Sequence, residues 1–173
     1  MRSNRGFSLI ELLIVVAIIL IIAAIAIPNL LQSRMSANES AAAGALRTLT
    51  SAEITYFNAY PTIGYASSIG QLGGASPCTP SSTSACIIDN FLATATPGGT
   101  GKSGYYFLAT GTITGGATYN DAYVLGAAPI GVHQTGNRDF CSVNDGVLRS
   151  QMGNTGDTPA NVVATCVAFP VAQ

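Results

Sequence analysis

The chain has 173 residues, of which 48% are hydrophobic and only 9% are charged, and its formal net charge is −1. Because an average soluble domain contains about 25% charged residues, the shortage of charge is the unusual property of this composition. So small a charge provides no basic surface for a specific nucleic acid partner, and the high apolar content excludes a largely disordered chain.

A long apolar run occupies residues 7–27, near the start of the chain. Nineteen of its 21 residues are apolar, the exceptions being Ser8 and Glu11. As a helix, this run would rise about 32 Å, which is close to the thickness of the hydrocarbon core of a bilayer. Arg2 and Arg5 precede the run. The pattern therefore predicts a membrane-spanning helix with its N-terminus in the cytoplasm and the rest of the chain exported.

Three interpretations of this run are possible, and Glu11 helps to distinguish them. An ordinary secretory signal peptide could be cleaved after Ala26, because Ala24-Ile25-Ala26 fits a small-x-small cleavage site. However, the apolar run exceeds the usual length of such a peptide, and an acidic residue costs up to about 2.5–3.5 kcal/mol at a bilayer centre. A plain membrane anchor leaves Glu11 equally unexplained. A carboxylate retained in this run therefore indicates a partner or a function.

The third interpretation rests on the stretch Arg5-Gly6-Phe7-Ser8-Leu9-Ile10-Glu11-Leu12-Leu13, which resembles the processing signal of type IV pilins and pseudopilins. The resemblance implies that a prepilin peptidase removes residues 1–6 by cleaving between Gly6 and Phe7, and that the new amine of Phe7 is methylated. Glu11 then becomes the fifth residue of the mature chain, which is the family's acidic position. Pro28 matches the proline that the family carries in its long helix. Removal of residues 1–6 leaves five basic and eight acidic residues, a formal net charge of −3.

The position of Glu11 also suggests how subunits would assemble. When apolar helices pack side by side, Glu11 of one subunit is expected to pair with the Phe7 ammonium group of a neighbour. A lone carboxylate is costly in a core without water, whereas a paired one is tolerable, so the pair would set the axial register. The remaining apolar residues would supply non-directional adhesion. Phe7, Glu11 and Pro28 are therefore the predicted assembly residues.

A second, amphipathic half of the helix is predicted after Pro28. This proline removes one backbone donor and is expected to kink or loosen the helix. Apolar residues then recur at helical spacing, with Glu53 interrupting the stripe. Because Pro61 disfavours helical geometry in the residue before it, one helix over residues 7–60 is predicted. The stripe residues expected to pack on a head domain are Leu46, Leu49 and Tyr56.

Residues 61–173 form the predicted head domain, in which glycine and proline are frequent. Residues 61–103 are expected to be mostly loop, with a short helical piece at Ile87–Ala93. Asn144-Asp145, followed by glycine, is typical of a tight hairpin turn. Antiparallel strands packed on the long helix predict an α+β fold, which is also the fold that the pilin resemblance implies. The predicted strands are Tyr105–Thr110, Ala122–Ala128, Arg138–Val143 and Gly146–Ser150.

Four cysteines follow the membrane segment, and an even number on the exported side favours disulfide bonds. Of the three possible pairings, we favour Cys78–Cys86 together with Cys141–Cys166. The first bond would close a small loop, and the second would tie a strand to the C-terminal tail. The second also resembles the disulfide-bounded C-terminal segment of pilins. Zinc is disfavoured because no two cysteines lie close together in the sequence.

No pattern of residues indicates catalysis. His133 is the single histidine and has no Ser/Asp constellation at a recognisable spacing. Asp139 and Asp145 flank a strand but lack the alternating oxygen ligands of a calcium loop. We therefore expect no enzyme activity, no cofactor and no bound metal.

The resemblance implies a structural function, that of a pilin subunit, in the first place the major pilin of a type IV pilus. Its expected partners are identical subunits, the prepilin peptidase, the inner-membrane assembly machinery and, before assembly, the membrane itself. The chain would cross the inner membrane once and later form an extracellular filament. Two alternatives remain open: a pseudopilin of a type II secretion system, and an exported binding or enzymatic domain cleaved after Ala26. Adhesion, motility, DNA uptake and conductivity are not distinguished by the sequence.

Overall fold

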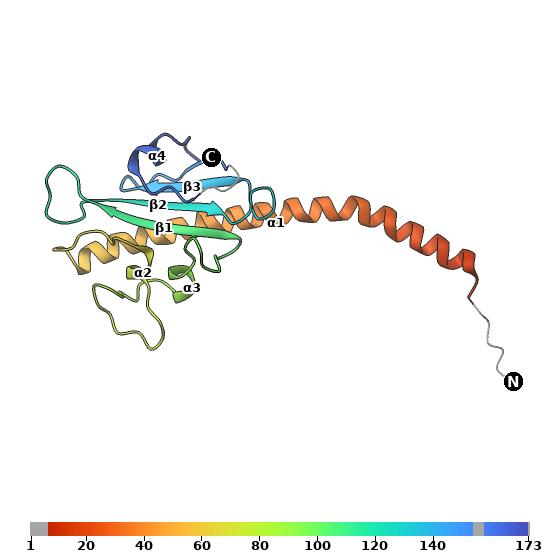
Figure 1. Cartoon of the computed structure of the whole chain (residues 1–173), viewed down its shortest axis with the longest axis horizontal. Coiled ribbons are helices and arrows are strands. Elements are labelled where there is room, and N and C mark those ends of the chain that lie inside the picture. Colours follow the sequence, from red (N-terminus) through yellow and green to blue (C-terminus); the bar gives the residue numbers. More distant parts are fainter. Residues whose placement is uncertain (1–6, 154–157, 173) are drawn as a thin grey trace. The chain divides into compact units, whose positions relative to one another are not determined.

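One long helix, α1 (Leu9–Ala59), begins the fold and is followed by a four-stranded sheet with short helices around it (Figure 1). The computed structural model describes residues 7–153 and 158–172, so the predicted leader, residues 1–6, lies outside the described residues. The other elements, in chain order, are α2 (Ile69–Leu72), α3 (Asn90–Ala93), β1 (Tyr105–Thr112), β2 (Ala122–Pro129), β3 (Arg138–Val143), β4 (Arg149–Met152) and α4 (Val163–Val167).

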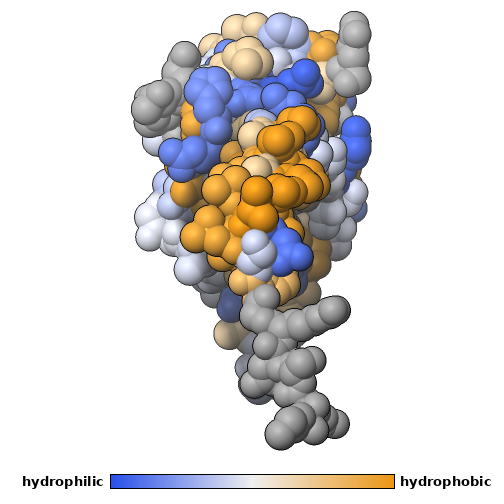
Figure 2. All heavy atoms as spheres, turned by 90° about the vertical axis from the view of Figure 1, so that its right-hand side faces the viewer, coloured by the Kyte–Doolittle hydropathy of each residue, from blue (hydrophilic) through white to orange (hydrophobic). Residues whose placement is uncertain are grey.

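The chain divides into two compact units, the first ending at Arg34 and the second beginning at Met35. In the first unit, the described side chains of α1 are almost all exposed, and most of them are large and apolar. Hydrophobic residues accordingly gather on the surface that the N-terminal half of α1 forms (Figure 2). By length and composition, α1 is able to cross a membrane. Pro28 lies inside α1, so the helix continues through this residue.

The sheet of the second unit is antiparallel and has the strand order β1-β2-β3-β4, so each strand pairs with its neighbours in sequence. β1 and β2 pair over their full lengths, with Tyr105 opposite Pro129 and Thr112 opposite Ala122. β3 then pairs with both β2 and β4. Together with the helix, this meander is the α+β fold predicted from the sequence.

The main core lies between α1 and one face of the sheet. α1 contributes a buried stripe that includes Leu46, Leu49 and Tyr56, as the helical spacing predicted. β1 buries alternate residues, which is the two-residue period of a strand with one covered face. The sheet side chains in this core are Tyr105, Phe107, Ala109, Tyr123, Leu125, Ala127 and Phe140.

The opposite face of the sheet is covered by the C-terminal segment. All eight residues of β2 are buried, because this inner strand is enclosed on both faces. α4 contacts β2 and β3 there. A second, smaller core contains Val124, Cys141, Val143, Cys166 and Phe169. The described part of the head thus has three layers: α1, the sheet and the C-terminal segment.

Several predicted elements differ in extent from the structure. α1 covers Leu9–Ala59 rather than residues 7–60, and β1 and β2 end at Thr112 and Pro129 rather than at Thr110 and Ala128. The strand predicted at Gly146–Ser150 is β4, at Arg149–Met152, because the turn is longer than two residues. Asp145 accepts a hydrogen bond from the N–H of Val147 at 2.9 Å, which keeps this stretch out of the ladder. The helical piece predicted at Ile87–Ala93 is α3, at Asn90–Ala93, which starts after Asp89 accepts from the N–H of Leu92 at 2.8 Å. α2 and α4 have no counterpart among the predicted elements.

We expect the Leu49→Ala variant to lower the free energy of unfolding by about 2–5 kcal/mol, because it leaves a cavity in the main core. Leu49 is fully buried, whereas Ile54, on the same helix, is 52% exposed. Ile54→Ala is therefore the matched control, with an expected loss below about 0.5 kcal/mol. Denaturant unfolding of the full chain in detergent, followed by near-ultraviolet tyrosine circular dichroism, measures both. Equal losses would contradict the packing described here.

Candidate functional site

The residues with a predicted role in processing lie at the start of the described chain. Gly6 is outside the described residues. Phe7 and Ser8 precede the first turn of α1, and the side chain of Phe7 is 78% exposed. The bond predicted to be cleaved is therefore adjacent to a helix end.

Glu11 lies in the first turn of α1, where its side chain contacts the backbone of the residue that precedes the helix. Oε2 of Glu11 accepts a hydrogen bond from the N–H of Ser8 at 2.9 Å. This contact is half of a capping box, in which an acidic residue at the third helical position satisfies the N–H of the residue that precedes the helix. The carboxylate also lies at the positive end of the helix dipole. The Ser8-Leu9-Ile10-Glu11 pattern carries this signal, but the sequence analysis missed it.

The capping contact leaves one oxygen of Glu11 available. The structure gives Oε1 no partner among residues 7–153 and 158–172. Between residues 7 and 33, Glu11 is also the single charged residue of the sequence. A carboxylate in such surroundings requires a cationic or hydrogen-bonding partner once water is removed. Phe7 is one residue away from the capping contact, so an amine created at Phe7 would be close to the carboxylate.

The second half of α1 is attached to the β2–β3 connection by two neighbouring polar residues. Nδ2 of Asn38 donates to the backbone oxygen of Thr135 at 2.8 Å. Glu39 accepts through Oε1 from the N–H of Asn137 at 2.8 Å, and its Oε2 lies 3.9 Å from Nε of Arg138. These contacts fix α1 against the head directly after the unit boundary at Met35. They join residues about a hundred positions apart, so no local pattern could predict them.

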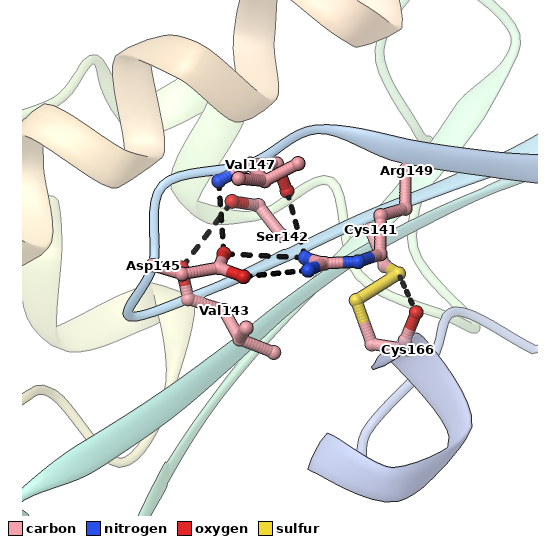
Figure 3. A network of polar contacts seen from close by, with 7 residues as sticks. All are labelled: Cys141, Ser142, Val143, Asp145, Val147, Arg149 and Cys166. Atoms are coloured by element: carbon pink, nitrogen blue, oxygen red, sulfur yellow. Dashed lines mark hydrogen bonds and ion pairs between the residues drawn. A yellow bond between two sulfur atoms is a disulfide. The ribbon is translucent and has the colours of Figure 1, made fainter. Parts of the chain in front are cut away.

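The cysteines form two disulfides in the structure, Cys78–Cys86 and Cys141–Cys166. These are the two pairs that the sequence analysis favours. The first closes a small loop, with 6.1 Å between its Cα atoms. The second joins β3 to α4, with 5.7 Å between its Cα atoms, and lies inside the second core (Figure 3).

Next to the second disulfide, Asp145 and Arg149 order the turn between β3 and β4. Both carboxylate oxygens of Asp145 accept from the guanidinium, at 2.5 and 3.2 Å, and Arg149 also donates to the backbone oxygen of Val147 (Figure 3). The hydrogen bond from Arg149 holds the pKa of Asp145 below its ordinary value and raises the pKa of Arg149. The two-point geometry fixes the hairpin where the C-terminal segment is attached.

The other polar residues considered in the sequence are His133, Asp139 and Asp145. His133 is exposed and its Nδ1 lies 2.8 Å from Oδ1 of Asn137. Within residues 7–153 and 158–172, no group of three or more His, Cys, Asp or Glu side chains is placed to hold a metal ion. Asp139 is buried on β3, whereas Asp145 is in the turn, paired with Arg149.

Comparisons with known proteins concern the N-terminal part of the chain. Residues 1–27 match a family model described as the prokaryotic N-terminal methylation motif. The chain is 62% identical over 40 residues to the type IV wide pilus major component PilA4 of Thermus thermophilus, which covers 23% of this chain and 30% of that protein. Over its N-terminal segment, the chain is similar to type IV pilins.

The comparison with a second curated protein agrees. The chain is 51% identical over 55 residues to the type IV major pilin protein PilA of Myxococcus xanthus, which covers 32% of this chain and 25% of that protein. The chain thus spans less than a third of the length of the curated relatives that it matches. No solved structure matches the chain with significance. The resemblance to type IV pilins predicted from the sequence is therefore confirmed over this segment.

Replacing Cys141 and Cys166 by serine is expected to lower the free energy of unfolding by about 3.5 kcal/mol, because the unfolded chain loses a 25-residue loop closure. The matched control replaces Cys78 and Cys86, whose shorter loop predicts a loss of about 2.5 kcal/mol. Denaturant unfolding of both variants under non-reducing conditions tests the difference. A smaller loss for the Cys141/Cys166 variant would contradict the role of this bond as the anchor of the C-terminal layer.

Proposed function

We propose that the chain is a structural subunit, the major pilin, of a type IV pilus. The observation that carries the proposal is the single carboxylate, Glu11, of the exposed apolar run over residues 7–27, which lies within the stretch that matches the methylation motif. The two relatives, one a major component of a type IV wide pilus and the other a type IV major pilin, support the same function.

Processing is the first step of the proposal. A prepilin peptidase cleaves between Gly6 and Phe7, removes residues 1–6 and leaves a free amine on Phe7, which is then methylated. The chain is the substrate in this step and contributes no catalytic group. The mature chain consists of a helix over residues 7–60, whose first part, 7–27, spans the inner membrane, and a head over residues 61–173. The exposure of Phe7 supports access to the bond.

Assembly is the second step. Extraction from the membrane by the inner-membrane assembly machinery leaves the apolar surface of α1 without lipid, and identical helices cover it. The free Oε1 of Glu11 pairs with the ammonium group of Phe7 on a neighbouring subunit, while Oε2 keeps the hydrogen bond from Ser8. The charged pair is directional and the apolar contact is not, so the pair sets the register. The result is a filament at the cell surface.

The exposed side of the second half of α1 is suited to the same packing. From residue 40 to residue 59, the exposed side chains are mostly small or carry a hydroxyl group, and the exceptions are Arg47, Ile54 and Asn58. The hydroxyl groups donate to the helix's own backbone, four residues earlier, and so require no water. These donors are Ser40, Thr48, Ser51 and Thr55, at 2.9–3.3 Å from their acceptors.

The Glu11→Gln variant tests this proposal, because it removes the charge and nearly preserves the shape of the side chain. We expect membrane insertion and processing to be unchanged but surface filaments to fall by more than about tenfold. The variant leaves the buried ammonium unpaired, at a cost of about 3–5 kcal/mol per subunit. Sheared filaments are quantified by electron microscopy and by immunoblotting against the membrane pool.

Asp121→Asn is the matched control, since it removes one carboxylate from an exposed site in the head. It is expected to assemble normally. Normal filaments from the Glu11→Gln variant would contradict the proposed pairing. If the wild-type chain forms only a short periplasmic assembly and no surface filaments, the chain is a secretion-system pseudopilin instead.

A further inference from the structure

Glu53 is a fully buried carboxylic acid in the main core of the head. It lies on α1 between the buried residues Ala52 and Tyr56. Its Oε2 accepts a hydrogen bond from the N–H of Ala66 at 2.9 Å. Its Oε1 is buried and has no hydrogen-bond partner among residues 7–153 and 158–172. The proposed assembly of the filament makes no use of this group.

The hydrogen bond from Ala66 attaches α1 to the segment that follows it. After α1 ends, the chain turns at Tyr60, whose backbone oxygen accepts from Ile63 and Gly64 at 3.0 and 3.1 Å. Tyr65 and Ile63 then exchange backbone hydrogen bonds with Asn120 in the β1–β2 connection. Glu53 holds this segment, residues 60–66, from the helix side by a hydrogen bond. Two ring contacts of α1, Tyr56 with Tyr60 and Phe57 with Tyr65, each at 4.9 Å, lie beside it.

The groups that face Glu53 provide no positive charge. Tyr56, on α1, and Tyr123, on β2, are the titratable neighbours. Burial is the main cause of the raised pKa values of both, and the negative charge of an ionised Glu53 adds to it. The ring of Tyr123 lies 4.7 Å from that of Tyr65 in the 60–66 segment. Among the described residues, no Lys, Arg or His forms an ion pair with Glu53. Burial raises the pKa of Glu53 to about 7, against the lowering effect of the hydrogen bond from Ala66.

We propose that Glu53 is a proton-operated lock, which holds residues 60–66 against α1 when its carboxyl group is protonated and releases them when it is ionised. A neutral carboxyl group tolerates the buried site, whereas a carboxylate with one unpartnered oxygen does not. The carboxylate gains hydration only when the 60–66 segment moves away from the helix. Ionisation therefore favours an open arrangement of this end of the head.

The direction of the pH dependence follows from the proton balance. The folded head keeps a proton on Glu53 up to about pH 7, whereas the unfolded chain releases it near the ordinary glutamate pKa of 4.5. The folded state therefore binds more protons between these values, and stability falls as pH rises through this window. The lock is closed in mildly acidic surroundings and loosened in alkaline ones.

Amide hydrogen exchange of the full chain in detergent tests the lock. After correction for intrinsic exchange rates, we expect protection of Tyr65 and Ala66 to fall by about tenfold from pH 6 to pH 8.5, most of it below about pH 7.5. In Glu53→Gln, which keeps an oxygen acceptor for Ala66 but cannot ionise, protection is expected to stay constant. Glu39→Gln, the control on the same helix, is expected to keep the wild-type dependence.

Two results would overturn the lock: protection in the wild-type chain that does not change with pH, and an unchanged dependence in Glu53→Gln. Should Glu53→Gln not fold, the carboxyl carbon of Glu53 in the wild-type chain provides a separate measurement by nuclear magnetic resonance. A titration midpoint near 7 supports the lock, and a midpoint near 4.5 contradicts it.

Discussion

The carboxylate of Glu11 is the constraint on which this account of the molecule depends. An apolar helix without it would be stable in lipid and would need nothing further. With Glu11, the apolar part of the helix carries one charge, which is energetically costly in hydrocarbon. The contact between Glu11 and the N–H of Ser8 satisfies one oxygen within the chain and leaves the other available. Removal of the leader would create a positive charge on Phe7, one residue before Ser8 and four residues before Glu11. Processing would therefore supply the charge that the carboxylate needs for assembly.

The later part of the same helix packs against the head. From Ala42 to Tyr56, one side of α1 is buried in the core. The other side carries Arg47, Ile54 and three residues whose hydroxyl groups donate to the backbone of the helix itself. The polar anchors at Asn38 and Glu39 fix where this change of environment begins. The low overall charge of the chain therefore has two causes: an apolar stretch over residues 7–33 with one charge, and a head with few charges that is held together by packing and disulfides.

Much of this organisation could be predicted from local sequence patterns. The apolar run, the stripe at Leu46 and Leu49, and the first three strands each depend on residues near one another in sequence. β4 begins three residues later than the turn sequence predicts, because the side chain of Asp145 accepts a hydrogen bond from Val147 and lengthens the turn. The contacts of Glu39 with Asn137 and of Glu53 with Ala66 depend on which segments the fold brings together, so no local pattern contains them. Glu53 interrupts the apolar stripe in the sequence, yet it is part of the core.

The pairing of Glu11 with an amine on Phe7 is tested by the mass of the N-terminal peptide from the chain isolated from membranes or filaments. A mature chain that begins with N-methylated Phe7, with Glu11 retained four residues later, is the predicted result. It would show that the charge of Glu11 and a new amine are present at the same helix end. A mature chain that begins at Ile27 would contradict the account, because cleavage after Ala26 removes Glu11 together with the whole apolar run.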